Sequence, residues 1–94
     1  MSGGNLGALN GVLTVMCGGE AEAFARVQPV LMAYARAVTL MGAAGAGQLT
    51  KMVNQVCVAG VLQGLAEGLA FGERAGLDMA RVLDVITQGA ASSW

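Results

Sequence analysis

Histidine is absent from this chain of 94 residues, and its absence excludes several kinds of chemistry. Without an imidazole there is no histidine acid or base, no Ser-His or Cys-His nucleophile pair, and no metal ligand of the commonest type. The two cysteines, Cys17 and Cys57, lie far apart and form no CxxC pair. We therefore expect no metal site and two buried free thiols, with a disulfide as the less favoured alternative.

Charged and aromatic side chains are also scarce. Charged residues make up 12% of the chain, aromatic residues make up 4%, and the net charge is −1. With neither a basic patch nor a stacking platform, the sequence predicts no nucleic-acid partner. A chain that is 55% hydrophobic must bury much of its surface, either against a partner or within a larger protein. No basic segment followed by an apolar segment opens the chain, so we expect no signal peptide and a cytoplasmic location.

The first half of the sequence has the pattern of two strands joined by a helix. Val12–Cys17 is apolar and rich in β-branched residues, and Ala37–Met41 has the same character. Between them, apolar residues at helical spacing predict a helix from about Glu20 to Tyr34. Strands that are separated by one helix pair in parallel, so this part is expected to be α/β. The glycine-rich segment Ser2–Gly7 is predicted to be a loop or a weak first turn.

The second half of the sequence is predicted to be helical. A loop over Gly42–Gly47 precedes the long segment Gln48–Arg74, which contains no proline. Gly76 is a typical residue for ending a helix, and Asp78 is a typical N-cap. A second helix should therefore begin at Asp78 and reach about Thr87.

Glycine recurs every four residues in the long helix, which makes a shallow stripe along one face. Another helix can pack closely against such a stripe, either in a soluble dimer or in a membrane. A membrane-spanning helix needs about 20 uninterrupted apolar residues, and polar side chains interrupt this one. We therefore predict no membrane partner, and a homo-oligomer that packs through this helix. The stripe consists of Gly60, Gly64, Gly68 and Gly72, and the interrupting residues are Gln63, Glu67 and Glu73.

The chain has a single lysine, Lys51, near the start of the long helix. An ammonium group is costly to place among apolar neighbours unless it has a partner or a task. Partial burial makes an amine suited to general acid/base catalysis, whereas the alternative is a lysine that reaches water from a helix end. Asn54 lies three residues later on the same helix face. Its amide can orient Lys51 or a substrate oxygen, or it can simply be solvated.

Two glycine-rich segments offer backbone N–H groups to a ligand. Gly45–Gly47 is not a GxGxxG fingerprint, because Thr50 occupies the position of the last glycine, and its spacing to the lysine does not fit a P-loop. It does provide a helix N-terminus that can face an anion. Ser2–Gly4 offers backbone amides and a hydroxyl that can bind a carboxylate, with a frayed terminus as the alternative.

Four segments, in this order, resemble the β-hydroxyacid dehydrogenases, the family of 3-hydroxyisobutyrate dehydrogenase and tartronate semialdehyde reductase (2-hydroxy-3-oxopropionate reductase). They are Ser2–Gly4, Gly11–Gly19, Gly45–Gln55 and Glu67–Asp78, and the lysine segment is the most specific of them. The resemblance implies an oxidoreductase that passes a hydride between NAD or NADP and the hydroxyl-bearing carbon of a small hydroxy acid. It does not indicate which of the two cofactors, or which hydroxy acid, is used.

The resemblance also implies roles for individual residues. Lys51 matches the catalytic lysine, which exchanges a proton with the substrate oxygen. Asn54 matches the amide that helps to hold the substrate. The loop that binds the substrate carboxylate is matched by Ser2, Gly3 and Gly4.

The implied fold is α/β, with the last strands of a Rossmann-type domain followed by the first helices of an all-α domain like that of 6-phosphogluconate dehydrogenase. The expected domains are residues 1–44 and 45–94. The family's GxGxxG segment is not in this sequence, so the cofactor-binding residues cannot be assigned, and we expect a fragment that is inactive alone. The alternative is a non-catalytic helical dimerisation module built on the glycine stripe, in which Lys51 is incidental.

Overall fold

The computed structural model describes residues 1–93. They form two compact units, one comprising residues 1–55 and the other beginning at Val56. The boundary between the two units falls inside helix α3 (Ala46–Arg74), at a different place from the predicted domain boundary at residue 44. Because a division into compact units need not coincide with domains, the domains 1–44 and 45–94 stay a prediction. The elements are α1 (Gly4–Leu9), β1 (Leu13–Cys17), α2 (Ala21–Met32), β2 (Ala35–Leu40), α3 (Ala46–Arg74) and α4 (Met79–Ile86).

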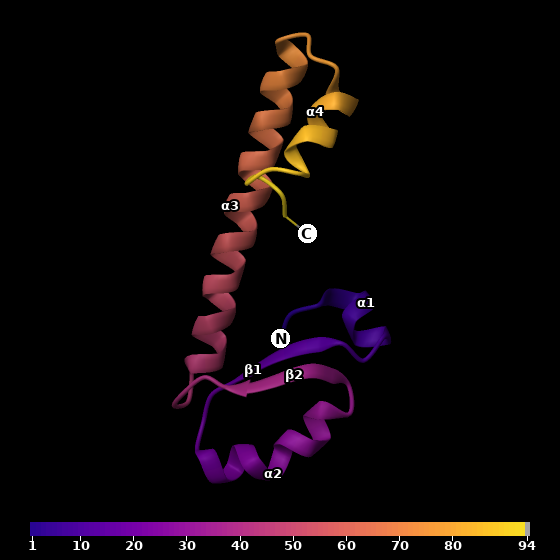
Figure 1. Cartoon of the computed structure of the whole chain (residues 1–94). Helices are drawn as coiled ribbons and strands as arrows, with labels where there is room; N and C mark the ends of the chain where they lie inside the picture. Colours follow the sequence, from indigo (N-terminus) through magenta and orange to yellow (C-terminus); the bar gives the residue numbers. More distant parts are fainter. Residues whose placement is uncertain (94) are drawn as a thin grey trace. The chain divides into compact units, whose positions relative to one another are not determined.

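The first unit is built on the parallel pair β1 and β2, which α2 connects (Figure 1). Val15 pairs with Val38 and Cys17 with Leu40, so both strands end at the same edge of the sheet. This arrangement confirms the predicted strand–helix–strand unit. The second strand begins at Ala35, two residues earlier than predicted, because α2 already ends at Met32.

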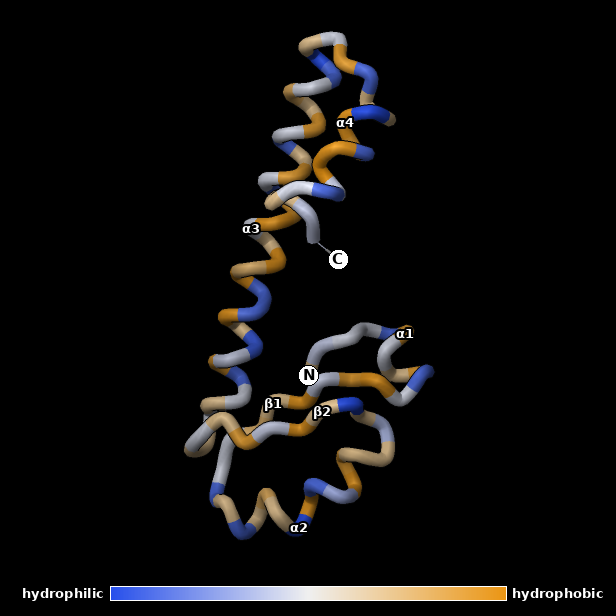
Figure 2. The backbone as a smooth tube through the Cα atoms, viewed as in Figure 1, coloured by the Kyte–Doolittle hydropathy of each residue, from blue (hydrophilic) through white to orange (hydrophobic). Residues whose placement is uncertain are grey.

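A small apolar core lies around the strand pair. Leu13, Val15 and Ala35 are buried, and Leu31 of α2 packs against them. In Figure 1, α1 lies beside β1 and α2 beside β2, on opposite sides of the pair. Figure 2 shows hydrophobic (orange) segments in both strands, as expected for strands that helices cover.

The prediction of a loop or weak turn over Ser2–Gly7 is wrong for its second half, because the helix α1 begins at Gly4. Glycine is a poor helix former, but packing compensates here. Gly7 is buried, and a Cβ on it would lie 3.1 Å from the Leu13 side chain. The positive φ angles of Gly3 (126°) and Gly4 (59°) turn the chain into this short helix.

Helix α3 begins at Ala46, two residues before the predicted start, and ends at Arg74 as predicted. Within residues 1–93 it is the one helix that is long and apolar enough to cross a membrane, a criterion that core helices of soluble proteins also meet. Much of its apolar surface is exposed: Met52 is 61% exposed and Val56 is 73% exposed. The expectation of two buried thiols is wrong. Both cysteines are free, but Cys57 in α3 is exposed and Cys17 at the end of β1 is only half-buried.

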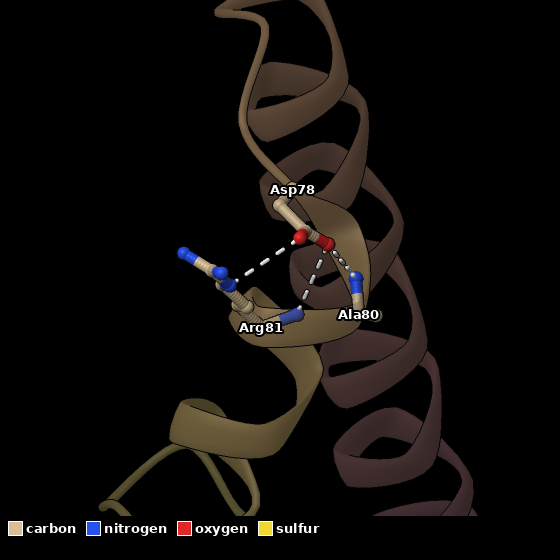
Figure 3. Close-up of polar contacts among 3 residues, drawn as sticks. All are labelled: Asp78, Ala80 and Arg81. Atoms are coloured by element: carbon tan, nitrogen blue, oxygen red, sulfur yellow. Dashed lines mark hydrogen bonds and ion pairs between the residues drawn. The ribbon is translucent and has the colours of Figure 1, made fainter.

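In the second unit, Gly76 and Asp78 mark the passage from α3 to α4 as predicted. Gly76 has a φ of 74°, the left-handed geometry that ends helices. The Asp78 carboxylate accepts hydrogen bonds from the backbone nitrogens of Ala80 (3.1 Å) and Arg81 (3.4 Å), as Figure 3 shows. These bonds satisfy two N–H groups that have no partner within the helix.

The glycine stripe of α3 is open along most of its length in this unit. Gly72 is buried, and a Cβ on it would lie 3.2 Å from the Met79 sulfur. Apart from the adjoining residues and backbone of α3 itself, no atom of residues 1–93 lies within 4 Å of the corresponding position on Gly60, Gly64 or Gly68. These three glycines line an apolar groove of about 430 Å³ together with Val82 and Ile86.

We expect the Asp78→Ala substitution to lower the free energy of unfolding by about 1 kcal/mol, because it removes the N-cap of α4. Chemical denaturation of the full-length protein measures this change. Asp78→Asn keeps an acceptor and should lose much less. Arg81→Ala is the matched control, since it removes only an exposed ion pair of 3.4 Å. An equal loss in Arg81→Ala would show that the ion pair, and not the cap, stabilises α4.

Candidate functional site

A cavity of about 680 Å³ lies in the first unit, where the carboxyl ends of β1 and β2 meet the first turns of α3. Cys17 and Leu40, which pair at the ends of the two strands, both line it. The loop after β1 contributes Gly18 and Gly19. Ligands of parallel α/β sheets bind outside the carboxyl ends of the strands, and this volume suits a small molecule.

Lys51 lines this cavity from the second turn of α3 and is half-buried. The Lys51 side chain is therefore partly exposed to solvent and partly covered by its neighbours. Most of the other side chains that line the cavity are apolar, but the cavity is open to solvent, and Met1, Val27 and Met52 are themselves exposed. The larger apolar side chains that line the cavity are Met1, Met16, Phe24, Val27, Leu40 and Met52.

The N-terminal turn of α3 also faces the cavity, through Gly47 and Gln48. A helix N-terminus carries partial positive charge on its unpaired N–H groups. Lys51 and this turn therefore place positive potential on one wall. Glu20, which is exposed, contributes the carboxylate among the lining residues. An anionic ligand with one oxygen near the amine suits this arrangement.

Asn54 shares a face of α3 with Lys51 and Gly47, as their spacing predicted. All three are buried or half-buried, whereas Met52 and Val53 on the other faces are exposed. Asn54 does not line the cavity, however, and its amide nitrogen donates to the Gln55 Oε1 at 3.0 Å. The structure thus brings Asn54 to the lysine face of the helix, outside the cavity wall.

The cavity is not lined by Ser2, Gly3 or Gly4, although these residues directly follow Met1, which does line it. Ser2 forms an antiparallel bridge with Thr14, with N–O distances of 2.8 and 2.9 Å. Met1, the residue before this bridge, does line the cavity. The backbone bridge therefore fixes the segment to β1 and holds Met1 at the site.

Sequence reasoning did not identify Gly18, Gly19 and Phe24 as residues of the site. A signal was available, because two glycines directly after a buried parallel strand stand where such sheets bind ligands. Within residues 1–93, no group of three or more cysteine, aspartate or glutamate side chains is placed to hold a metal ion.

Comparisons with known proteins point to one family. Residues 45–94 match the family model described as the NAD-binding domain of NADP-dependent 3-hydroxyisobutyrate dehydrogenase, and residues 1–43 match the NAD-binding domain of 6-phosphogluconate dehydrogenase. Both matched families bind NAD-type cofactors, which agrees with the predicted NAD or NADP. The two matches together cover nearly the whole sequence.

Individual relatives agree with the family models. The chain is 61% identical over its full length to an uncharacterized oxidoreductase of Shewanella frigidimarina, and covers 32% of it. It is 40% identical to the 2-hydroxy-3-oxopropionate reductase of Escherichia coli over 99% of the chain, again covering 32% of that protein.

A solved structure supports the same assignment. The 3-hydroxyisobutyrate dehydrogenase of Mycobacterium tuberculosis, determined with L-serine, superposes with a TM-score of 0.89 and 36% identity, over 99% of this chain and 32% of that one. This chain therefore spans about a third of the length of the proteins that it matches. The α/β architecture, the lysine-bearing segment and both family matches lead to one conclusion: the chain belongs to the β-hydroxyacid dehydrogenase family of 3-hydroxyisobutyrate dehydrogenase.

Proposed function

We propose that this chain is part of an NAD(P)-dependent oxidoreductase that transfers a hydride between the cofactor and a small β-hydroxy acid or semialdehyde. The observation that carries the proposal is the position of Lys51, half-buried in a mainly apolar cavity at the carboxyl ends of two parallel strands. Family membership and the names of the relatives support the reaction class. Bound NAD or NADP supplies the site that accepts or donates the hydride.

Lys51 acts as the general acid/base in this proposal. During oxidation its neutral amine accepts the proton of the substrate hydroxyl, and during reduction its ammonium group donates a proton to the carbonyl oxygen. The positive charge also stabilises a developing alkoxide.

Substrate binding is assigned to two neighbouring groups. Asn54 lies one helical turn beyond Lys51 on the same face, so a substrate that extends along α3 comes within reach of its amide. Ser2 follows Met1, which lines the cavity, and its N–H already donates to the Thr14 carbonyl oxygen. The Ser2 hydroxyl and the N–H groups of Gly3 and Gly4 are therefore assigned to the substrate carboxylate. No cofactor contacts are assigned to individual side chains.

The exposed apolar surface of α3 supports a place within a larger assembly. Its side chains and the open glycines Gly60, Gly64 and Gly68 leave a face that suits a packed helix. We assign this face to contacts within the longer oxidoreductase and its homo-oligomer. The cytoplasmic location, the absence of a membrane or nucleic-acid partner and the inactivity of this chain alone belong to the same proposal.

A second candidate function is a non-catalytic dimerisation module. The apolar groove of about 430 Å³ along the stripe favours it, since such a groove is useful without any chemistry. In that case Lys51 would be incidental. The two candidates therefore differ in what happens when Lys51 is replaced.

We expect Lys51→Ala in the full-length protein to lower kcat at least about 100-fold while the nicotinamide cofactor still binds, because a general acid/base is lost. Steady-state kinetics with short hydroxy acids measure kcat, and fluorescence titrations of NADH and of NADPH measure cofactor binding. Lys51→Arg keeps a positive charge but cannot release a proton, so it should not restore turnover. Leu49→Ala, an exposed residue of the same helix turn, is the control. Unchanged turnover in Lys51→Ala would favour the dimerisation module.

The Asn54→Ala substitution should raise KM for the hydroxy acid about tenfold, the effect of losing one hydrogen bond of about 1.4 kcal/mol. The matched control is Gln55→Ala, which removes the present partner of the Asn54 amide but no proposed substrate contact. Its KM should stay close to that of the wild type. Equal effects of both substitutions would mean that the amide pair stabilises the helix and does not bind the substrate.

A further inference from the structure

Two glycines, Gly18 and Gly47, meet where the loop after β1 touches the first turn of α3. A Cβ on Gly18 would lie 2.5 Å from the Ala43 carbonyl oxygen and 2.9 Å from the Ala46 nitrogen. A Cβ on Gly47 would collide with the Met16 carbonyl oxygen. The obstructing atoms on both sides belong to the backbone and cannot rotate away as a flexible side chain can.

The two positions require glycine for space and not for backbone conformation. Neither residue has a positive φ, whereas Gly42 and Gly45 in the adjoining loop do. Gly47 is buried and lies inside α3, where glycine is intrinsically less favourable than alanine. What glycine provides there is the close approach of two main-chain segments.

This contact lies one helical turn from Lys51. Gly18, Gly47 and Lys51 all line the cavity, and Gly47 stands four residues before Lys51, on the same face of the helix. A helix moves as a rigid body over a single turn, so any displacement at Gly47 is passed on to Lys51. The depth of the contact thus sets how far the amine enters the cavity.

We propose that Gly18 and Gly47 are positioning residues, whose backbone contact places the Lys51 amine against the reacting oxygen. This role rests on the proposed function of Lys51 as the acid/base. Relief of either collision requires a shift on the order of 1 Å, which is enough to cost about 100-fold in rate when the misplaced group is catalytic. Neither glycine touches the substrate oxygen itself in this proposal.

The test uses Gly47→Ala and Gly18→Ala in the full-length protein, with Leu49→Ala as the control from the same turn. We expect kcat to fall about 10- to 100-fold in both glycine variants, with the affinity for the reduced cofactor, NADH or NADPH, within about twofold of the wild type. Reductive methylation of Lys51, followed by peptide mass spectrometry, measures the placement of the amine without relying on turnover. Its rate should change in both glycine variants and not in Leu49→Ala.

Each other outcome has a definite meaning. A folded Gly47→Ala with wild-type kcat and wild-type methylation of Lys51 would overturn the positioning role. So would a fall in kcat without any change at Lys51, because the loss would then arise elsewhere in the cavity. Failure of both variants to fold would also overturn it, since the contact would then serve folding. If the wild-type protein shows no turnover with any hydroxy acid, the proposed function is wrong. The methylation rate of Lys51 would still show whether the two glycines place its amine.

Discussion

The parallel pairing of β1 with β2 is the constraint on which the site depends. It brings the carboxyl ends of both strands, Cys17 and Leu40, to one edge of the sheet. The loops that leave this edge then lead in one case to α2 and in the other to α3. A lysine in the second turn of α3 is thereby delivered to the same edge, although it is distant in sequence from the loop after β1. Without the pairing, Cys17 and Leu40 would not lie side by side in the wall of the cavity.

Much of the fold follows from local patterns in the sequence. The apolar, β-branched run Val12–Cys17 and the cap at Asp78 each carry their structural signal within a few residues, and the structure has the expected strand and cap there. The short helix α1 was missed because its reason lies elsewhere: Gly7 packs on Leu13, a contact that helix propensity does not register. The start of α3 was placed two residues late because Gly45 and Gly47 resemble loop residues.

The site was only partly accessible to sequence reasoning. Lys51 stands out as the single lysine of an apolar chain, and helical periodicity places Asn54 on its face. The cavity that gives the lysine a chemical setting could not be predicted, because its walls come from segments that are remote in sequence. The contact between Gly18 and Gly47 was missed for the same reason, since a sequence does not show which main-chain segments will touch. Family resemblance suggests the roles of Lys51 and Asn54, and of these two residues the structure places only Lys51 at the cavity.

The contact between Gly18 and Gly47 is made by uncharged main-chain atoms. Dissolved ions weaken attractions between exposed charges, but they do not act on close packing of this kind. If this contact places the amine as proposed, ionic strength should have little effect on that placement, even where surface ion pairs such as that of Asp78 with Arg81 are screened. Salt then acts on the charge of the amine and of its ligand, and not on this main-chain packing.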